Sequence, residues 1–123
     1  VTGPGLGFVD VYNPNGKFLK RFATRGVLNA PWGVALAPPS FGSAKGTLLV
    51  GNFGDGRINA FDYRTGRSLG PLLGAGTTPI EIEGLWGLQF GSGFASQPVD
   101  TLFFTSGPDD EEHGLYGRLE PMP

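Results

Sequence analysis

The sequence predicts an all-β protein made of repeated short strands, and its composition and internal repeats carry this prediction. The 123 residues include 22 Gly and 11 Pro, which mark many turns, and an apolar share of 39%, which is sufficient for a core. The sequence around Trp32 recurs around Trp86, 54 positions later, and Gly46–Phe53 aligns with Asp100–Gly107 at the same spacing. Repeats of about 40 to 50 residues, each with several short strands, are typical of β-propeller blades.

Two hairpins are expected where apolar and polar residues alternate on both sides of a turn sequence. In the first turn, Asn13–Gly16, proline presets φ and the Asn-Gly pair accepts a positive φ. The second turn, Tyr63–Gly66, occupies the matching place, and the two turn glycines stand 50 positions apart. We therefore align the first hairpin with the second at a spacing of 50. The four strands of these hairpins are predicted at Phe8–Tyr12, Lys17–Phe22, Ile58–Asp62 and Arg67–Leu72.

Two further segments are apolar without interruption, which predicts strands that are covered on both faces. These segments are Leu48–Val50 and Leu102–Phe104, and each lies in the second strand of a repeat. The strands outside the hairpins are predicted at Trp32–Ala37, Thr47–Gly51, Leu85–Phe90, Thr101–Thr105 and Leu115–Leu119.

These nine strands amount to one complete four-stranded blade between two partial blades. We assign residues 1–29 to the outer strands of a first blade, residues 30–73 to the complete blade, and residues 74–123 to the inner three strands of a last blade. A closed propeller has typically 4 to 8 blades, so further chain or other copies must complete this one. The chain starts with Val1 and stops after the third strand of a blade, which favours a fragment of a longer propeller over an assembly of copies.

Composition excludes several classes of protein. The net charge is −2, with nine basic and eleven acidic residues spread along the chain, so no basic surface for nucleic acid is expected. No apolar run approaches the roughly 18 residues that span a bilayer, so no membrane span is expected. The chain has no Cys, which excludes disulfides and zinc–thiolate sites without indicating a compartment.

The strand around Trp32 and the segments after it resemble an NHL repeat. Pro31–Leu36 is similar to the first strand of that repeat, and Leu48–Asp62 is similar to its second strand and its Arg-Ile-x-x-Phe-Asp motif. Gly7–Tyr12, Leu28–Gly33 and Leu85–Leu88 also resemble a family of secreted bacterial NHL-like propellers that is associated with PEP-CTERM protein-sorting systems. The resemblance implies a propeller fold and an extracellular location, and it implies no particular substrate or small ligand.

Polar residues gather in the loops that the antiparallel strand order brings to one face of the expected propeller. Carboxylate and amide oxygens of this kind suit Ca²⁺. The alternative is that these residues form turns, with Asp55-Gly56 supplying a positive φ and Asn52 bonding to nearby backbone, and we favour this alternative. The candidate metal ligands are Asn29, Asn52, Asp55 and Glu83.

A second polar cluster and two tryptophans are candidates for a ligand or interaction face. Asp109 and Asp110 lie close to His113, the single histidine, so general-base chemistry is one interpretation, and a solvated acidic loop is the favoured one. Trp32 and Trp86 each precede a glycine at matching positions of the repeat. We expect both indoles to pack between blades, and stacking on a sugar is the alternative.

These features favour a noncatalytic extracellular propeller that serves as a scaffold for protein interaction or assembly. Its expected partners are the remaining part of its own propeller or further copies of the chain, and no catalytic or cofactor-binding residue is assigned. A divalent-metal-dependent hydrolase or lactonase resembling the SMP-30 group, with Ca²⁺ as its cofactor, is the first alternative. A carbohydrate-binding propeller is the second alternative.

Overall fold

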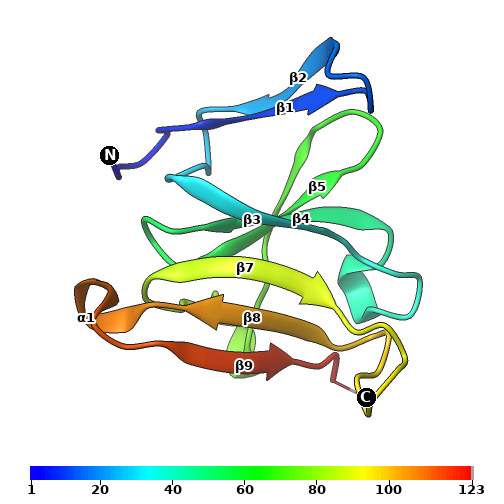
Figure 1. The fold of residues 1–123 in the computed structure, drawn as a ribbon, viewed down its shortest axis with the longest axis vertical. Coiled ribbons are helices and arrows are strands. Elements are labelled where there is room, and N and C mark those ends of the chain that lie inside the picture. The colour runs from blue at the N-terminus through cyan, green and yellow to red at the C-terminus, as the bar shows by residue number, and fades with distance from the viewer. Residues whose placement is uncertain (123) are drawn as a thin grey trace.

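The computed structural model describes residues 1–122 and consists of three antiparallel sheets (Figure 1). Sheet 1 holds β1 and β2, sheet 2 holds β3 to β6, and sheet 3 holds β7 to β9, each in chain order. The strands are β1 (Phe8–Tyr12), β2 (Phe18–Thr24), β3 (Pro31–Leu36), β4 (Thr47–Asn52), β5 (Ile58–Asp62), β6 (Ser68–Pro71), β7 (Leu85–Phe90), β8 (Leu102–Ser106) and β9 (Leu115–Leu119).

The prediction of an all-β chain is confirmed, and each of the nine predicted strands is present in its predicted sheet. The ends differ by at most two residues, as in β2, which continues to Thr24. Three short helical turns lie in the loops, η1 (Gly42–Ala44), η2 (Ala75–Thr77) and α1 (Pro108–Glu111). Within residues 1–122, none of these helical segments has the length and apolar character needed to cross a membrane.

The spacing of 50 assigned to the two hairpins is wrong for their first strands. The turn of the first hairpin closes from Asn13 to Gly16, whereas that of the second closes from Asp62 to Gly66 and is one residue longer. Tyr12 and Phe61 both lie opposite the first residue of the returning strand, so β1 aligns with β5 at a spacing of 49 and β2 aligns with β6 at 50. A slip of one residue exchanges the two faces of a strand, so this correction decides which side chains of β1 point outward.

Both hairpin turns are closed by a side-chain oxygen at their first residue. Asn13 Oδ1 accepts hydrogen bonds from two backbone N–H groups of its turn. The Asp62 carboxylate accepts hydrogen bonds from the backbone N–H groups of Thr65 and Arg64, at 3.0 and 2.9 Å, and these bonds lower the pKa of Asp62. The turns therefore use the short polar side chains that favour this geometry.

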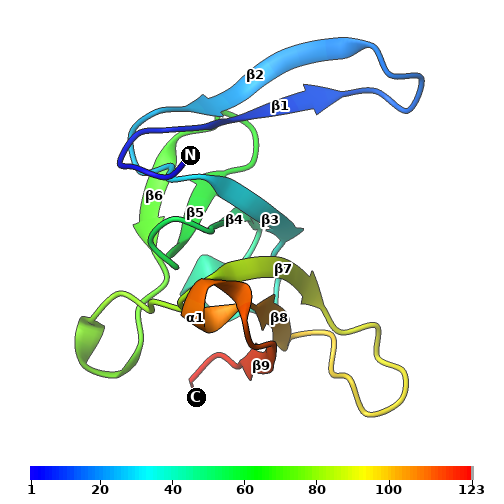
Figure 2. The same ribbon diagram turned by 60° about the vertical axis from the view of Figure 1, so that its left-hand side comes forward.

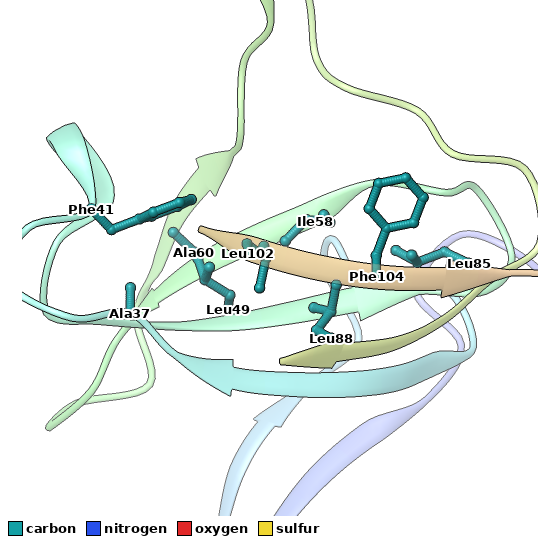
Figure 3. Packing of buried hydrophobic residues seen from close by; sticks show 9 residues of the cluster. All are labelled: Ala37, Phe41, Leu49, Ile58, Ala60, Leu85, Leu88, Leu102 and Phe104. Atoms are coloured by element: carbon teal, nitrogen blue, oxygen red, sulfur yellow. The ribbon is translucent and has the colours of Figure 1, made fainter. Parts of the chain in front are cut away.

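Sheets 2 and 3 pack face to face across a core of apolar side chains, which point toward one another in Figure 3. The strands β3 and β7 approach so closely that a Cβ atom added to Gly33 would lie 2.6 Å from the carbonyl oxygen of Trp86. Close contact therefore requires glycine at this position. The buried members of the core are Ala37, Phe41, Leu49, Ile58, Ala60, Leu85, Leu88, Leu102 and Phe104.

Sheet 1 packs on the other face of sheet 2, so sheets 1 and 3 lie at opposite ends of the stack (Figures 1 and 2). Along β4, Leu49 belongs to the core with sheet 3 and Val50 belongs to the core with sheet 1. The prediction that this apolar strand is covered on both faces is therefore confirmed. The buried members of the core between sheets 1 and 2 are Phe22, Leu28, Val50 and Phe61.

The same prediction is wrong for one face of β8. Leu102 and Phe104 are buried against sheet 2, as expected. Phe103 lies on the opposite face of sheet 3, where its ring stacks on that of Tyr116 with 5.8 Å between the ring centroids. Within the described residues, no fourth sheet covers this face.

The sequence repeat is also a repeat of backbone hydrogen bonds. The N–H of Phe53 donates to the carbonyl of Ala30 at 2.9 Å, and 54 residues later the N–H of Gly107 donates to the carbonyl of Gly84 at 2.8 Å. The other repeated pair is Ala37 to Thr47 and Gly91 to Thr101. Sheets 2 and 3 therefore share one backbone plan, and their residues can be compared position by position.

Candidate functional site

The loops that precede β3 and β7 and those that follow β4 and β8 meet at one end of the stack, on the left in Figure 1. The N–H of Gly54 donates to the carbonyl of Asn29 at 3.0 Å, which joins the loops before β3 and after β4. The N–H of Ile82 donates to the carbonyl of Gly56 at 2.9 Å, which joins sheet 2 to the segment that leads into sheet 3. The predicted polar residues therefore lie at a common edge, and their contacts show what each one does.

Asn29 and Asn52 are buried and bond to backbone. Asn52 is 0% exposed, its Oδ1 accepts a hydrogen bond from the N–H of Asn29 at 3.1 Å, and its Nδ2 donates to the carbonyl of Val27 at 2.8 Å. The Oδ1 of Asn29 accepts a hydrogen bond from the N–H of Gly3 at 2.8 Å. Asn52 therefore holds the segment that joins sheet 1 to sheet 2, and its carboxamide oxygen is already engaged.

Asp55 and Glu83 are also engaged by backbone. Asp55 Oδ1 accepts a hydrogen bond from the N–H of Arg57 at 3.0 Å, which is the turn geometry favoured by the sequence. Glu83 Oε2 accepts one from the N–H of Asp109 at 2.7 Å. Among residues 1–122, no three His, Asp or Glu side chains are grouped so that they could hold a metal ion. Each of the four predicted ligands accepts a hydrogen bond from a backbone N–H group, whereas Ca²⁺ takes six to eight oxygen ligands that converge on one point.

The acidic segment after β8 forms the single turn α1, whose Asp109 and Asp110 adopt left-handed φ values of 56° and 54°. His113 Nε2 lies 3.8 Å from Asp109 Oδ2, and both side chains are exposed. An exposed pair of this kind is neither desolvated nor held in one orientation, which are the conditions that make a histidine an effective general base. The geometry of this segment therefore agrees with the favoured interpretation, a solvated acidic loop.

The two tryptophans lie in different surroundings, although the repeat makes them equivalent. Trp86 is half-buried, and its Nε1–H donates to Glu111 Oε2 at 2.9 Å. Trp32 is 69% exposed and rests against Phe53 with 6.2 Å between ring centroids, so the expectation that it packs between sheets is wrong. The physical reason is that sheet 1 has two strands within the described residues, and they cover the part of sheet 2 around Val50 and leave Trp32 exposed.

Reasoning from single residues did not predict the exposed apolar surfaces. Comparison of equivalent positions in the repeat identifies them. Trp32 shares one face of β3 with Val34 and Leu36, and all three side chains are exposed. Their counterparts 54 positions later are Trp86, Leu88 and Phe90, and Leu88 and Phe90 pack against sheet 2. Trp32, Val34 and Leu36 therefore form an exposed apolar stripe on β3 at positions whose counterparts in sheet 3 are packed.

The open face of sheet 3 is a second surface of this type. It contains a hollow of about 350 Å³ whose lining includes Gly87, Gln89, Phe103, Thr105 and Tyr116. A larger groove of about 660 Å³ lies between β6 and the segment after β9, where the lining is mainly apolar and Glu120 is the single ionisable side chain among the described residues. The polar side chains that line the first hollow are Gln89, Ser92, Gln97, Thr105 and Tyr116.

Three uncharacterised proteins of Acanthamoeba polyphaga mimivirus are similar to the chain. The first is 44% identical over 121 residues, 97% of the chain and 28% of the viral protein, and the second is 43% identical over 121 residues, 97% of the chain and 30% of that protein. The third is 42% identical over 104 residues, 85% of the chain and 19% of that protein. The chain therefore spans less than a third of these curated relatives, and they are viral, whereas the resemblance implied a bacterial source. No protein-family profile and no solved structure matches the chain.

Proposed function

We propose that the three sheets are consecutive blades of a β-propeller, and that this part of the propeller is a noncatalytic extracellular scaffold for protein interaction or assembly. The observation that carries the proposal is the agreement between sheets 2 and 3, which share strand order and backbone hydrogen bonds at a spacing of 54 residues. Blades are four-stranded sheets arranged around a central channel, and the order β3-β4-β5-β6 supports this assignment for sheet 2.

The close approach of the first strands of sheets 2 and 3 also supports the blade assignment. Gly33 on β3 and Gly87 on β7 occupy the same position of the repeat, and Gly33 lies against the backbone of β7. The first strands of propeller blades line the channel, so they are the strands expected to lie nearest to one another. The resemblance to NHL repeats supports the same fold and supplies the extracellular location.

The noncatalytic part of the proposal is supported by the polar loop residues, whose side chains already form hydrogen bonds with backbone. Asn52 and Asn29 bond to backbone in the interior, and Asp55 and Glu83 bond to backbone at the surface. The contacts of Asn29, Asn52 and Glu83 connect separate segments of the chain, and that of Asp55 closes its own turn. Their arrangement suits a framework that holds the sheets together, and the exposed apolar faces suit contacts with other polypeptide.

Calcium binding and lactone hydrolysis test the noncatalytic scaffold against the metal-dependent hydrolase. We expect no heat of binding on titration with CaCl₂, the same melting temperature with calcium and with a chelator, and no turnover of a panel of lactones. Binding of Ca²⁺ that raises the melting temperature, together with hydrolysis that the chelator abolishes, would overturn the proposal in favour of the hydrolase. Asp55→Ala serves as the control, because loss of a calcium ligand at the surface would weaken any binding of Ca²⁺ relative to the parent chain.

The exposure of Trp32 beside Phe53 supports one second candidate, carbohydrate binding. Aromatic rings that are exposed and fixed against a neighbour can stack on the apolar face of a sugar ring. Titration with a panel of oligosaccharides, followed by tryptophan fluorescence, tests this candidate. A saturable change that disappears in Trp32→Ala and persists in Trp86→Phe would support it, and no change with any sugar in the panel would exclude binding of those sugars.

A further inference from the structure

We infer, on the basis of the proposed blade architecture, that a β-hairpin of the full-length protein pairs with the free edge of β1 and covers the apolar stripe of β3. The two strands of this hairpin precede β1 in the chain and are the equivalents of β3 and β4 in sheet 1. The stripe consists of Trp32, Val34 and Leu36, which are exposed.

Sheet 1 makes only the outer half of the contact that sheet 2 makes with sheet 3. At the spacing of 49, Val9 and Val11 of β1 are the counterparts of Ile58 and Ala60 of β5. Val9 and Val11 pack on sheet 2, just as Ile58 and Ala60 pack on sheet 3. The strands β1 and β2 therefore act toward the sheet that follows them as β5 and β6 act toward theirs.

The inner half of the contact between sheets 2 and 3 is made by β3 and β4. A Cβ atom on Gly33 would lie 3.1 Å from Leu88 Cγ, and one on Gly51 would lie 3.2 Å from Leu88 Cδ1. The counterpart of Leu88 in sheet 2 is Val34, which is 45% exposed, whereas Leu88 is 8% exposed. Among the described residues, sheet 1 has no strand in the place of β3 or β4, so the stripe stays uncovered.

The edge of β1 that a further strand would join has no partner among the described residues. The strand β5 pairs with β4 on one side and β6 on the other, whereas β1 pairs with β2 alone. An unpaired edge of this kind presents backbone N–H and C=O groups that can bind another strand. In both views β1 lies between β2 and β3, so a strand added to its free edge extends sheet 1 in the direction of β3 (Figures 1 and 2).

The residues before β1 occupy the place of the loop between β4 and β5. The N–H of Ile82 donates to the carbonyl of Gly56 at 2.9 Å, and the N–H of Ala30 donates to the carbonyl of Leu6, also at 2.9 Å. Gly56 and Gly7 have positive φ values of 74° and 120°, and a Cβ atom on either would clash with residues at the entry to the following sheet. The polypeptide that enters this loop therefore comes from the place of β4, beside β1.

Further chain of the same protein fits this surface better than a second copy does. In a second copy, β3 and β4 are already joined to β5 and packed on sheet 3, so they are not free to add to β1. The chain spans 28% and 30% of two mimivirus relatives, so more than two-thirds of each relative lies outside the matching region. That length is ample for two strands, since β3, β4 and their connection occupy only residues 31–52.

The sequence that precedes Val1 in the full-length protein is the first test. Gly33 precedes Ile58 by 25 positions, and Val9 is the counterpart of Ile58. We therefore expect an apolar strand that contains a glycine roughly 17 residues before Val1, followed by a second apolar strand that leads into Val1. A full-length chain without two such strands before Val1 would overturn the inference.

A fused copy of the chain's own inner hairpin tests whether the surface accepts these strands. A copy of residues 30–52 that carries Trp32→Phe is joined to Val1 by a short Gly-Ser linker, which gives the copy a high effective concentration at β1. We expect a blue shift of tryptophan emission and weaker quenching by acrylamide, because Trp32 of the parent part is covered. The urea midpoint should rise by roughly 0.5 to 1 M.

The matched control is the same fusion with Leu49→Asp in the copy. Leu49 is 0% exposed in the chain and lies in the core that faces the following sheet, so a charge there should prevent the copy from packing. We expect the control to keep the emission, quenching and urea midpoint of the parent chain. A fusion that behaves like its control would overturn the inference.

A pair of charge substitutions shows where the fused strands lie. Val34→Asp places a carboxylate on the stripe, and Val99→Asp places one in the loop before β8, where the side chains are 45% and 54% exposed. Val34→Asp should lower the urea midpoint by roughly 0.5 M more in the fused chain than in the parent chain, because the fused strands remove this carboxylate from water. Val99→Asp should have the same effect in both chains, and circular dichroism shows whether each variant is folded.

Equal effects of Val34→Asp in the fused and parent chains would overturn the inference. The proposed scaffold would survive that result, because the stacking of sheets 2 and 3 is tested separately by Gly33→Ala. A failure of the blade architecture itself would appear as an unchanged stability of Gly33→Ala in the parent chain, where no strand has been added.

Discussion

Substitution of Gly33 by alanine tests the stacking of sheets 2 and 3, and Gly87 provides a control at the same position of the repeat. In Gly33→Ala the new Cβ atom would lie 2.6 Å from the carbonyl oxygen of Trp86 and 2.9 Å from the backbone nitrogen of Leu88. Both obstacles are backbone atoms, so no side-chain rotation removes them. An ordinary contact needs about 3.5 Å, so the strands β3 and β7 must separate by roughly 0.9 Å.

The expected change in the free energy of unfolding follows from this separation. A gap of roughly 0.5 to 1 Å removes a quarter to a half of each dispersion contact, and excess volume in a packed core costs about 1 to 3 kcal/mol. Because the obstacle is backbone, we expect Gly33→Ala to lower the free energy of unfolding by about 2 to 3 kcal/mol. In Gly87→Ala the nearest atom is Thr105 Oγ1 at 3.3 Å, and alanine is favoured over glycine in a strand, so the change should stay within about 0.5 kcal/mol.

Urea denaturation followed by tryptophan fluorescence and circular dichroism measures both variants. With a slope of about 1 to 3 kcal/mol per molar urea, the expected loss lowers the midpoint of Gly33→Ala by roughly 1 M or more. The midpoint of Gly87→Ala should stay close to that of the parent chain. Equal midpoints for the two variants would refute the reasoning, because they would mean that β7 does not lie against β3 at this position.

Four further substitutions test the loop contacts and the hairpin turn. Asn52→Ala should lower the free energy of unfolding, measured by urea denaturation, by about 3 kcal/mol, because it leaves a buried N–H and a buried carbonyl unpaired. Ser106→Ala is the control at the equivalent position. It removes a hydroxyl that has no partner among the described residues, so it should cost less than about 1 kcal/mol in the same measurement. Ala30 has a φ of 51°, so Ala30→Gly should raise the melting temperature through a gain of about 0.5 to 1 kcal/mol, and a lower melting temperature would contradict this. The lowered pKa of Asp62 means that its carboxylate contributes stability above its ordinary pKa, and this contribution is lost as the pH falls through the lowered value. An NMR titration of Asp62 should therefore give a midpoint below 3.8, and Asp62→Asn should remove this part of the acid sensitivity.

Local patterns were sufficient to predict the strands. Alternation around Asn13–Gly16 placed the first hairpin, and the recurrence of Trp32 at Trp86 placed the first strands of sheets 2 and 3. These signals act over a few residues, because a strand needs an alternating or continuous apolar pattern and a turn needs residues that accept its backbone angles. Sheet membership followed because consecutive strands joined by short loops pair with one another.

The candidate site was less predictable, because several residue types suit both a ligand and a structural contact. The oxygen atoms of Asn29, Asn52 and Glu83 were predicted as metal ligands, and each accepts a hydrogen bond from backbone. An amide or carboxylate in a loop satisfies nearby N–H groups as readily as it binds a cation. Which of these it does depends on the distances that the folded loops impose.

The sequence by itself determined the strands, their order within each sheet, and the repeat that makes sheets 2 and 3 equivalent, because these depend on short-range pattern and on identity between segments. The tertiary structure alone decided which faces are covered, and so why Trp32 is exposed while Trp86 is half-buried. It also decided the one-residue offset of β1, since the length of a turn is set by its closed hydrogen bonds. Burial is a property of neighbouring sheets, and identical sequence patterns acquire different surroundings when one of them has a neighbour and the other does not.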